Sequence, residues 1–172
     1  MTISFELSEK SVEGAIHRIE LYTKDLKTKT EILVDKLAKD VRENAERELV
    51  ANANGDEQFD STFDSLTIEK SGQYTRRVLA GGDAIWLEFG TGVVANPVGV
   101  GGYAHPKAQE LGMYGIGEYG HGMGANPKGW WYTSASGESV HTYGIPATMF
   151  MYHSAWQTRA KIPEMARRLF HT

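Results

Sequence analysis

Three things are missing from this sequence, and each absence removes a class of protein. None of the 172 residues is cysteine, which excludes disulfides, thiolate metal sites and cysteine nucleophiles. The net charge of -4 gives no general basic surface for binding phosphates, although a local basic patch stays open. No apolar run approaches the length of a membrane span, and residues 1–10 lack the apolar core of a signal peptide. We therefore expect a soluble protein made in a cytoplasm, with no membrane partner.

The composition that remains is that of one ordinary globular domain. Hydrophobic residues make up 41% and charged residues 23% of the chain. The length fits a single domain over residues 1–172 with a modest core. We predict an α+β fold: a small antiparallel β-sheet packed by a long N-terminal helix and a C-terminal helix, with a long Gly-rich loop inserted.

Helical periodicity predicts a helix over about residues 11–50. Small or apolar side chains recur every three or four residues there and form one stripe: Leu26, Thr30, Leu33, Leu37, Val41, Ala45 and Leu49. Asn54-Gly55 supplies a stop, because both residue types adopt the left-handed conformation readily. Such a stripe either covers the protein's own sheet or binds a partner. We favour the first, since most amphipathic helices cover a core.

Strand-like runs separated by glycine turns predict a sheet over about residues 59–90 and 130–142. The first three runs, 62–70, 73–80 and 84–89, are typical of an antiparallel meander. Adjacent Arg76 and Arg77 point to opposite faces of the middle strand, so one of them is expected near the helix or a neighbouring subunit. The later residues predict a second hairpin.

Glycine is concentrated in one region, since sixteen of the 19 glycines fall between residues 81 and 144. We predict a loop insertion over about residues 91–129, and its tyrosines indicate a functional or partner-ordered loop rather than a linker. A C-terminal helix is predicted over about residues 147–170, with Pro163 either kinking it or starting a separate final turn. Basic residues on this helix suit DNA or an acidic neighbour, although a solvated face is favoured: Arg159, Lys161, Arg167 and Arg168.

No constellation of catalytic residues stands out. Residues 115–120 fit the spacing G-x-G-x-x-G, but glycine and proline follow where a nucleotide-binding helix would have to begin. Three histidines are candidates for zinc ligation or proton transfer, but their spacing is not that of a metal site: His105, His121 and His141. The nearby carboxylates Glu110 and Glu118 lie in glycine-rich sequence, whereas metal ligands need rigid support. We therefore predict that the chain is not an enzyme and has no cofactor or metal site. The alternative is a small metal-dependent hydrolase that uses the loop histidines and glutamates.

The aromatic residues are stronger evidence than the histidines, and they indicate subunit contacts. Adjacent Trp130 and Trp131 cannot both point inward from a strand, so one should meet solvent, the loop or another subunit. Core packing is the competing explanation for the tryptophans. The candidate subunit-interface residues are Trp86, Glu88, Phe89, Tyr103, Tyr114, Tyr119, Trp130 and Trp131.

Two short motifs carry a resemblance to a known family. The first motif is Trp86-Leu87-Glu88-Phe89-Gly90-Thr91, and the second is Ile145-Pro146-Ala147-Thr148-Met149-Phe150-Met151. With these motifs in this order between two helices, the chain resembles the HK97 gp10-like family of tailed-bacteriophage head–tail connector and tail-completion (neck) proteins. The insertion between the motifs is long for that family, and Thr148 interrupts its usual Pro-Phe spacing. The expected structural residues of the motifs are Gly90, Thr91, Gly92, Pro146 and Phe150.

The resemblance implies a structural virion protein of the head–tail junction, synthesised in the host cytoplasm. It implies a homo-oligomeric ring, a hexamer or dodecamer, that joins tail to head around the DNA channel. Its partners would be other neck and tail proteins, and double-stranded DNA would pass through without sequence-specific binding. A tail terminator or stopper ring is the alternative position. We further expect residues 93–129 to reach an adjacent subunit or the next ring, and residues 88–92 to fix where the loop leaves the sheet.

Overall fold

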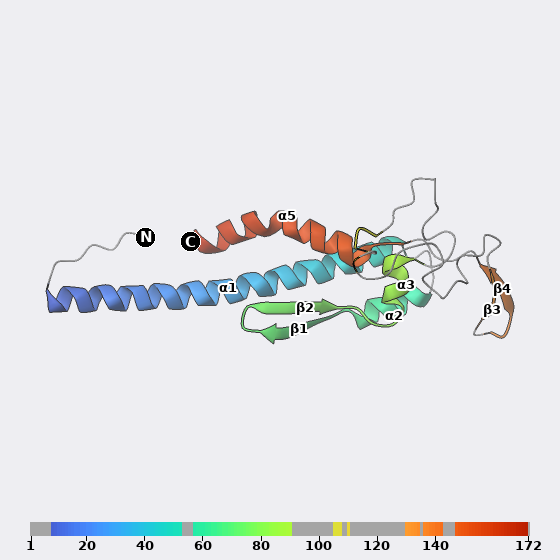
Figure 1. Ribbon diagram of the computed structural model, residues 1–172, viewed down its shortest axis with the longest axis horizontal. Helices are drawn as coiled ribbons and strands as arrows, with labels where there is room; N and C mark the ends of the chain where they lie inside the picture. Colours follow the sequence, from blue (N-terminus) through green and yellow to red (C-terminus); the bar gives the residue numbers. More distant parts are fainter. Residues whose placement is uncertain are drawn as a thin grey trace.

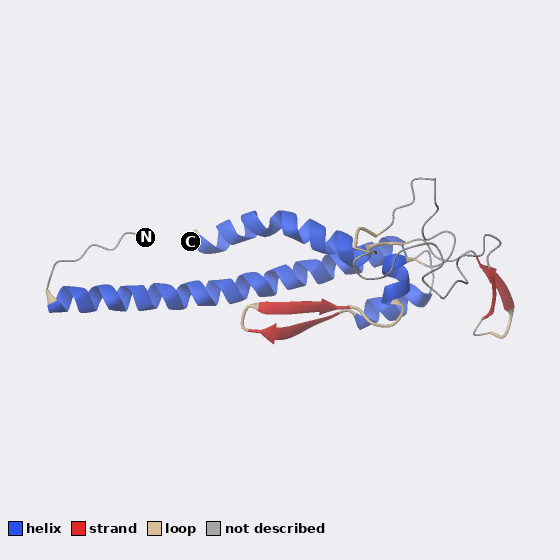
Figure 2. Cartoon of the chain, in the orientation of Figure 1, coloured by secondary structure: helices blue, strands red, loops and turns tan. Residues whose placement is uncertain are grey.

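A computed structural model gives an α+β fold in which two helices run side by side (Figure 1). It describes residues 8–52, 57–90, 105–107, 110, 130–134, 136–142 and 147–171. In chain order the elements are α1 (Glu9–Asn52), α2 (Glu57–Ser65), β1 (Thr67–Gly72), β2 (Thr75–Leu79), α3 (Ala84–Phe89), β3 (Trp130–Thr133), β4 (Ser139–Thr142) and α5 (Phe150–Phe170). The predicted fold class is confirmed, although the strands form two separate two-stranded sheets rather than one (Figure 2). Most of the predicted loop over residues 91–129 lies outside the described residues.

The long helix α1 packs chiefly against α5, and polar side chains cross the interface. The Asn44 amide donates to the Thr158 hydroxyl at 3.0 Å, and this hydroxyl donates to the Asp40 carboxylate at 2.7 Å. The Lys161 ammonium donates to both oxygens of the same carboxylate, at 2.8 and 2.9 Å. Burial works to raise the pKa of Asp40, but the hydrogen bonds from Lys161, Thr158 and Asn44 outweigh it and hold the pKa below its usual range.

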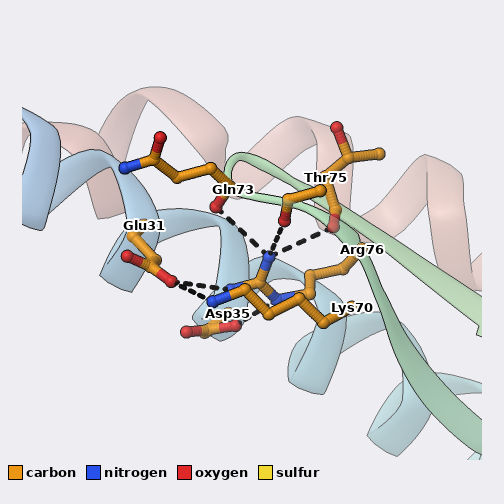
Figure 3. Close-up of polar contacts among 7 residues, drawn as sticks. Glu31, Asp35, Lys70, Gln73, Thr75 and Arg76 are labelled. Carbon is orange, nitrogen blue, oxygen red and sulfur yellow. Dashed lines mark hydrogen bonds and ion pairs between the residues drawn. The ribbon is translucent and has the colours of Figure 1, made fainter.

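The β1–β2 hairpin lies against α1 and is held in shape by Arg76 (Figure 3). In the hairpin, Ile68 pairs with Val78 and Lys70 pairs with Arg76. The Arg76 side chain is 5% exposed. Its Nη1 donates to three carbonyls around the turn, those of Gly72, Gln73 and Thr75, at 2.9, 3.3 and 3.1 Å.

Two carboxylates of α1 fasten this hairpin to the helix. Arg76 Nε donates to Asp35, while Nη2 lies 3.5 Å from Glu31, which also pairs with Lys70. The hydrogen bond from Lys70 lowers the pKa of Glu31, and the one from Arg76 lowers the pKa of Asp35. One of the two adjacent arginines was expected near the helix, and Arg76 confirms this, whereas Arg77 is exposed. α1 therefore carries the first hairpin on one side and α5 on another.

Of the three strands predicted over residues 62–89, the third is wrong and the first is wrong in its first residues. The run 84–89 is the short helix α3, and residues 62–65 belong to α2, so the meander has two strands. The spacing of apolar residues alone cannot distinguish a strand from a helix in so short a run. In the fold, Ala84, Leu87 and Glu88 are buried together, a spacing of three and four residues that only a helix places on one face.

The core lies where α1, α2, α3 and α5 meet. Leu49, Leu87 and Phe150 are almost fully buried, at 1%, 0% and 0% exposure. Ala45, Leu66 and Ala84 fill the space between them. This end of the molecule therefore brings the first and second sequence motifs into one apolar cluster.

The C-terminal part of the chain matches its prediction with small changes. α5 begins at Phe150 rather than near residue 147, and it continues through Pro163 without a separate final turn. Figure 1 shows α5 curved along its length, as expected when a proline removes one helical hydrogen bond. The second hairpin is confirmed as β3–β4, and Trp131 in it is 66% exposed with its ring against His141.

Candidate functional site

A buried carboxylate joins the two sequence motifs. Glu88, on α3, is 7% exposed and reaches the first turn of α5. Its Oε2 accepts the Met151 N–H at 2.8 Å, and its Oε1 accepts the Tyr152 N–H at 3.0 Å. The first N–H groups of a helix have no partner within the helix, and they form a partial positive charge that an anion stabilises. Glu88 thus caps α5 from a residue more than sixty positions earlier in the chain.

The backbone reinforces this cap. The Leu87 carbonyl accepts both the Thr148 N–H at 2.8 Å and the Thr148 hydroxyl at 2.9 Å. The Glu88 carbonyl accepts the Met149 N–H at 3.2 Å. Met149 has a φ of 53°, the left-handed conformation that costs a residue with a side chain about 1–2 kcal/mol. The surrounding contacts hold it there, and they set how α3 and α5 sit against each other.

His105 closes the site from a third direction. It is 7% exposed, and its Nε2 lies 2.9 Å from Glu88 Oε1. Its Nδ1 accepts the Lys107 N–H at 3.0 Å, so the ring proton sits on Nε2 and is donated to Glu88. The imidazole packs between the rings of Phe89 and Tyr152, with centroid distances of 4.5 and 5.2 Å. We call this set, Leu87, Glu88, His105 and Thr148 to Tyr152, the Glu88 junction.

The chemistry of the Glu88 junction is that of a structural connection. Both nitrogens of His105 are engaged, and both oxygens of Glu88 accept hydrogen bonds. The Glu88 carboxylate accepts three hydrogen bonds in all, from two backbone N–H groups and from His105. Among the described residues, no group of three or more histidine, cysteine or acidic side chains could hold a metal ion. The junction is suited to holding three segments of chain together.

The structure brings some predicted site residues together and separates others. Glu88, Phe89, Gly90 and Phe150 meet at the Glu88 junction or directly beside it, and Glu88 makes its contacts inside the chain. Trp86 is half-buried, and Trp131 stands on the separate second hairpin. The remaining predicted residues lie outside the described part of the chain: Tyr103, Tyr114, Tyr119, Thr91, Gly92, Pro146 and the side chain of Trp130.

Three residues of the junction were not foreseen in their roles. His105 was considered as a candidate for zinc ligation or proton transfer, yet it bonds to Glu88, 17 positions away. Thr148 looked like an interruption of the second motif, but its hydroxyl donates to the carbonyl of the distant Leu87, a contact for which the sequence has no local signal. Nothing in the spacing of Tyr152 announces its contact with His105.

Comparisons with known proteins add no relative. No family model, no curated protein and no solved structure matches this chain. Within the described residues, no helix is long and apolar enough to span a membrane. The functional proposal therefore depends on the residues and their geometry.

Proposed function

We propose that this chain is a structural virion protein of a tailed bacteriophage, a ring-forming subunit at the head–tail junction that joins tail to head around the DNA channel. The observation that carries the proposal is the Glu88 junction. It unites the two motifs on which the resemblance to phage neck proteins depends. The first motif caps the helix that the second motif begins, so the two motifs form one structural unit although they lie far apart in the sequence.

The junction also supports the idea of a presented segment. The described residues Gly90 and Ala147 lie next to Leu87 and Thr148 in the sequence, and Leu87 and Thr148 are hydrogen-bonded to each other. His105 fastens an intermediate point to the same core. A segment whose two ends are fixed to the same core can reach a neighbouring subunit without disturbing the fold. The subunits of a ring meet through two different surfaces, and such a segment can supply one of them.

Charge supports a channel subunit that does not retain DNA. The net charge is -4, and most basic side chains of α5 are engaged within the chain. Lys161 pairs with Asp40, Arg168 pairs with Glu164, and the Arg159 guanidinium lies 5.8 Å from the centre of the Trp156 ring. Paired basic side chains on α5 and an acidic net balance weaken the electrostatic attraction of this chain for DNA.

The proposal is tested in phage particles. Residues 111–129 are replaced by a Gly/Ser linker of equal length, which spares His105 and Glu110, and the variant is supplied in place of the wild-type protein. We expect filled heads and finished tails that remain separate in electron micrographs, with the purified variant as helical as the wild type. Complementation with the wild-type chain should restore joined particles. Joined particles at wild-type yield, either with this variant or without the protein altogether, would overturn the proposal.

A further inference from the structure

The apolar stripe of α1 has a seven-residue repeat that extends well beyond the part covered by α5. Two positions of each repeat form a continuous seam, which we call the α1 seam: Val12, Ile16, Ile19, Thr23, Leu26, Thr30, Leu33 and Leu37. Alternating steps of four and three residues are the pattern of helices that pack along each other as coiled coils. The seam therefore predicts a helical partner along its whole length.

α5 supplies that partner for the C-terminal half only. The next two positions of the repeat, Asp40 and Asn44, are the residues that bond to Thr158 of α5. Lys161 lies opposite Asp40, and the helices run antiparallel, so α5 ends near residue 31 of α1 at about 1.5 Å per residue. Figure 1 shows α1 continuing well past the end of α5.

The N-terminal half of the seam is left exposed. Val12, Ile16, Ile19 and Leu26 have exposures of 37%, 52%, 51% and 40%. An isolated helical segment draws most of its stability from packing of its apolar face, and this face continues an interface that is already formed further along.

The two threonines of the seam are apolar in practice. The Thr23 hydroxyl donates to the Ile19 carbonyl at 2.8 Å, and the Thr30 hydroxyl donates to the Leu26 carbonyl at 2.8 Å. Because each hydroxyl is satisfied within the helix, the threonine methyl group can face a partner without leaving a polar group unpaired.

We propose that a second copy of this chain covers the exposed seam, with its own α1 running antiparallel. In the register that aligns the seams, Ile16 faces Leu26 of the second copy, and Ile19 faces its Thr23. The flanking charges favour this direction, because Glu13 then lies beside Lys27 of the second copy, and this contact occurs twice. Neither residue is in a salt bridge within the described chain.

A parallel arrangement has no comparable match. The flanking position of Tyr22 would then meet Lys27, and that of Ala15 would meet Glu20, so no pair of opposite charges forms. The antiparallel arrangement has one unfavourable contact, Glu20 against Glu20 of the second copy, on the two-fold axis. This repulsion between the two Glu20 side chains exists only in the antiparallel pair, so its removal should strengthen an antiparallel dimer and not a parallel one.

This pairing is independent of the proposed function. An antiparallel pair of identical helices is a closed two-fold contact, whereas a ring with one-directional order needs unlike surfaces. The pair is a property of the free subunit in solution. It can therefore be present or absent whatever the outcome of the particle experiment.

The first test is sedimentation velocity over a range of concentrations, with Ile19→Asp as the disrupting variant. Leu21→Asp is the matched control, because Leu21 is 54% exposed on the opposite side of α1. We expect a concentration-dependent dimer for the wild type and the control, and a monomer for Ile19→Asp, with all three equally helical. A wild-type chain that stays monomeric at every concentration would overturn the proposal.

The second test reads the direction of the pair through charge. Glu13→Lys and Lys27→Glu should each weaken the dimer about 5- to 30-fold, because two attractive contacts become repulsive, and the double variant should restore it. Glu20→Gln should tighten the dimer. Equal affinity for all of these variants would contradict the antiparallel register.

The third test uses the absence of cysteine from the natural chain. Ile16→Cys and Leu26→Cys are oxidised separately and as a mixture, since a disulfide needs Cα atoms within about 7 Å. We expect a disulfide-linked dimer in the mixture and little in either variant alone. Linkage within each separate variant would indicate a parallel pair and overturn the proposal.

Discussion

The Nε2 atom of His105 lies 2.9 Å from Oε1 of Glu88 in a site where both residues are 7% exposed. This contact ties a point in the middle of the glycine-rich region to the helix cap that unites the two motifs. A neutral imidazole whose other nitrogen accepts a backbone N–H can only donate toward the carboxylate. The pair is therefore a directional link, and the stability of α5 should depend on it.

Removal of the Glu88 carboxylate should destabilise the whole chain. Glu88→Ala leaves the first N–H groups of α5 and the His105 N–H buried without acceptors, so we expect the free energy of unfolding to fall by about 2–4 kcal/mol in urea titrations. Glu88→Gln, which keeps one oxygen, should fall between this variant and the wild type. Glu110→Ala, at an exposed residue, is the control and should stay within about 0.5 kcal/mol. An unchanged unfolding midpoint for Glu88→Ala would contradict a capping role.

The cluster around Asp40 should make part of the stability depend on pH. Because the pKa of Asp40 is lowered in the folded chain, its ionised form stabilises the fold above the usual value of 3.8, and this contribution is lost as the pH falls through the lowered pKa. Asp40→Asn should therefore be less stable than the wild type at neutral pH, with the difference shrinking below about pH 3.8. Unfolding curves of both chains over this range test the prediction. A difference that stayed constant with pH would rule it out.

Arg76 should matter far more than its neighbour Arg77. Arg76→Ala removes the donor to three carbonyls of the hairpin turn and the link to α1, so we expect a loss of about 2 kcal/mol and faster amide exchange in β1 and β2. Arg77→Ala, at an exposed position, should stay within about 0.5 kcal/mol. Equal effects of the two substitutions would mean that the contacts around Arg76 contribute little.

The aromatic residue of the second motif should be the most costly core substitution. Phe150 is 0% exposed, so Phe150→Ala should lower the free energy of unfolding by about 3–5 kcal/mol. Trp156→Ala, on the same helix but 61% exposed, should change it by no more than about 1 kcal/mol. Thermal and urea unfolding of the two variants measure the contrast. A larger loss at Trp156 would mean that α5 packs on a different face.

Long periodic segments could be predicted from the sequence, and short ones could not. The stripe through Leu33 and Leu37 extends over many turns, so the length of α1 emerged within two residues at each end. The run 84–89 is shorter than two turns of helix and carries no decisive period, and only its packing against Leu49 and Phe150 makes it a helix.

The candidate site was visible in its parts but not in its assembly. The motif around Glu88 was singled out as a fold element, yet its role as a cap for α5 depends on two segments meeting in space. The bond between His105 and Glu88 likewise has no local sequence signature, because imidazole in glycine-rich sequence has many ordinary uses. Contacts of this kind are decided by tertiary structure.

The pairing of Leu87 with Thr148 has a consequence for how this protein can change over generations. Once the two ends of an intervening stretch are bonded to each other, the entropic cost of that stretch grows only with the logarithm of its length, about 0.6 kcal/mol for each doubling. Insertions between residues 110 and 130, which leave His105 and the second hairpin as they are, are thus nearly neutral for folding, and new recognition sequences can be tried there while the helices remain as they are.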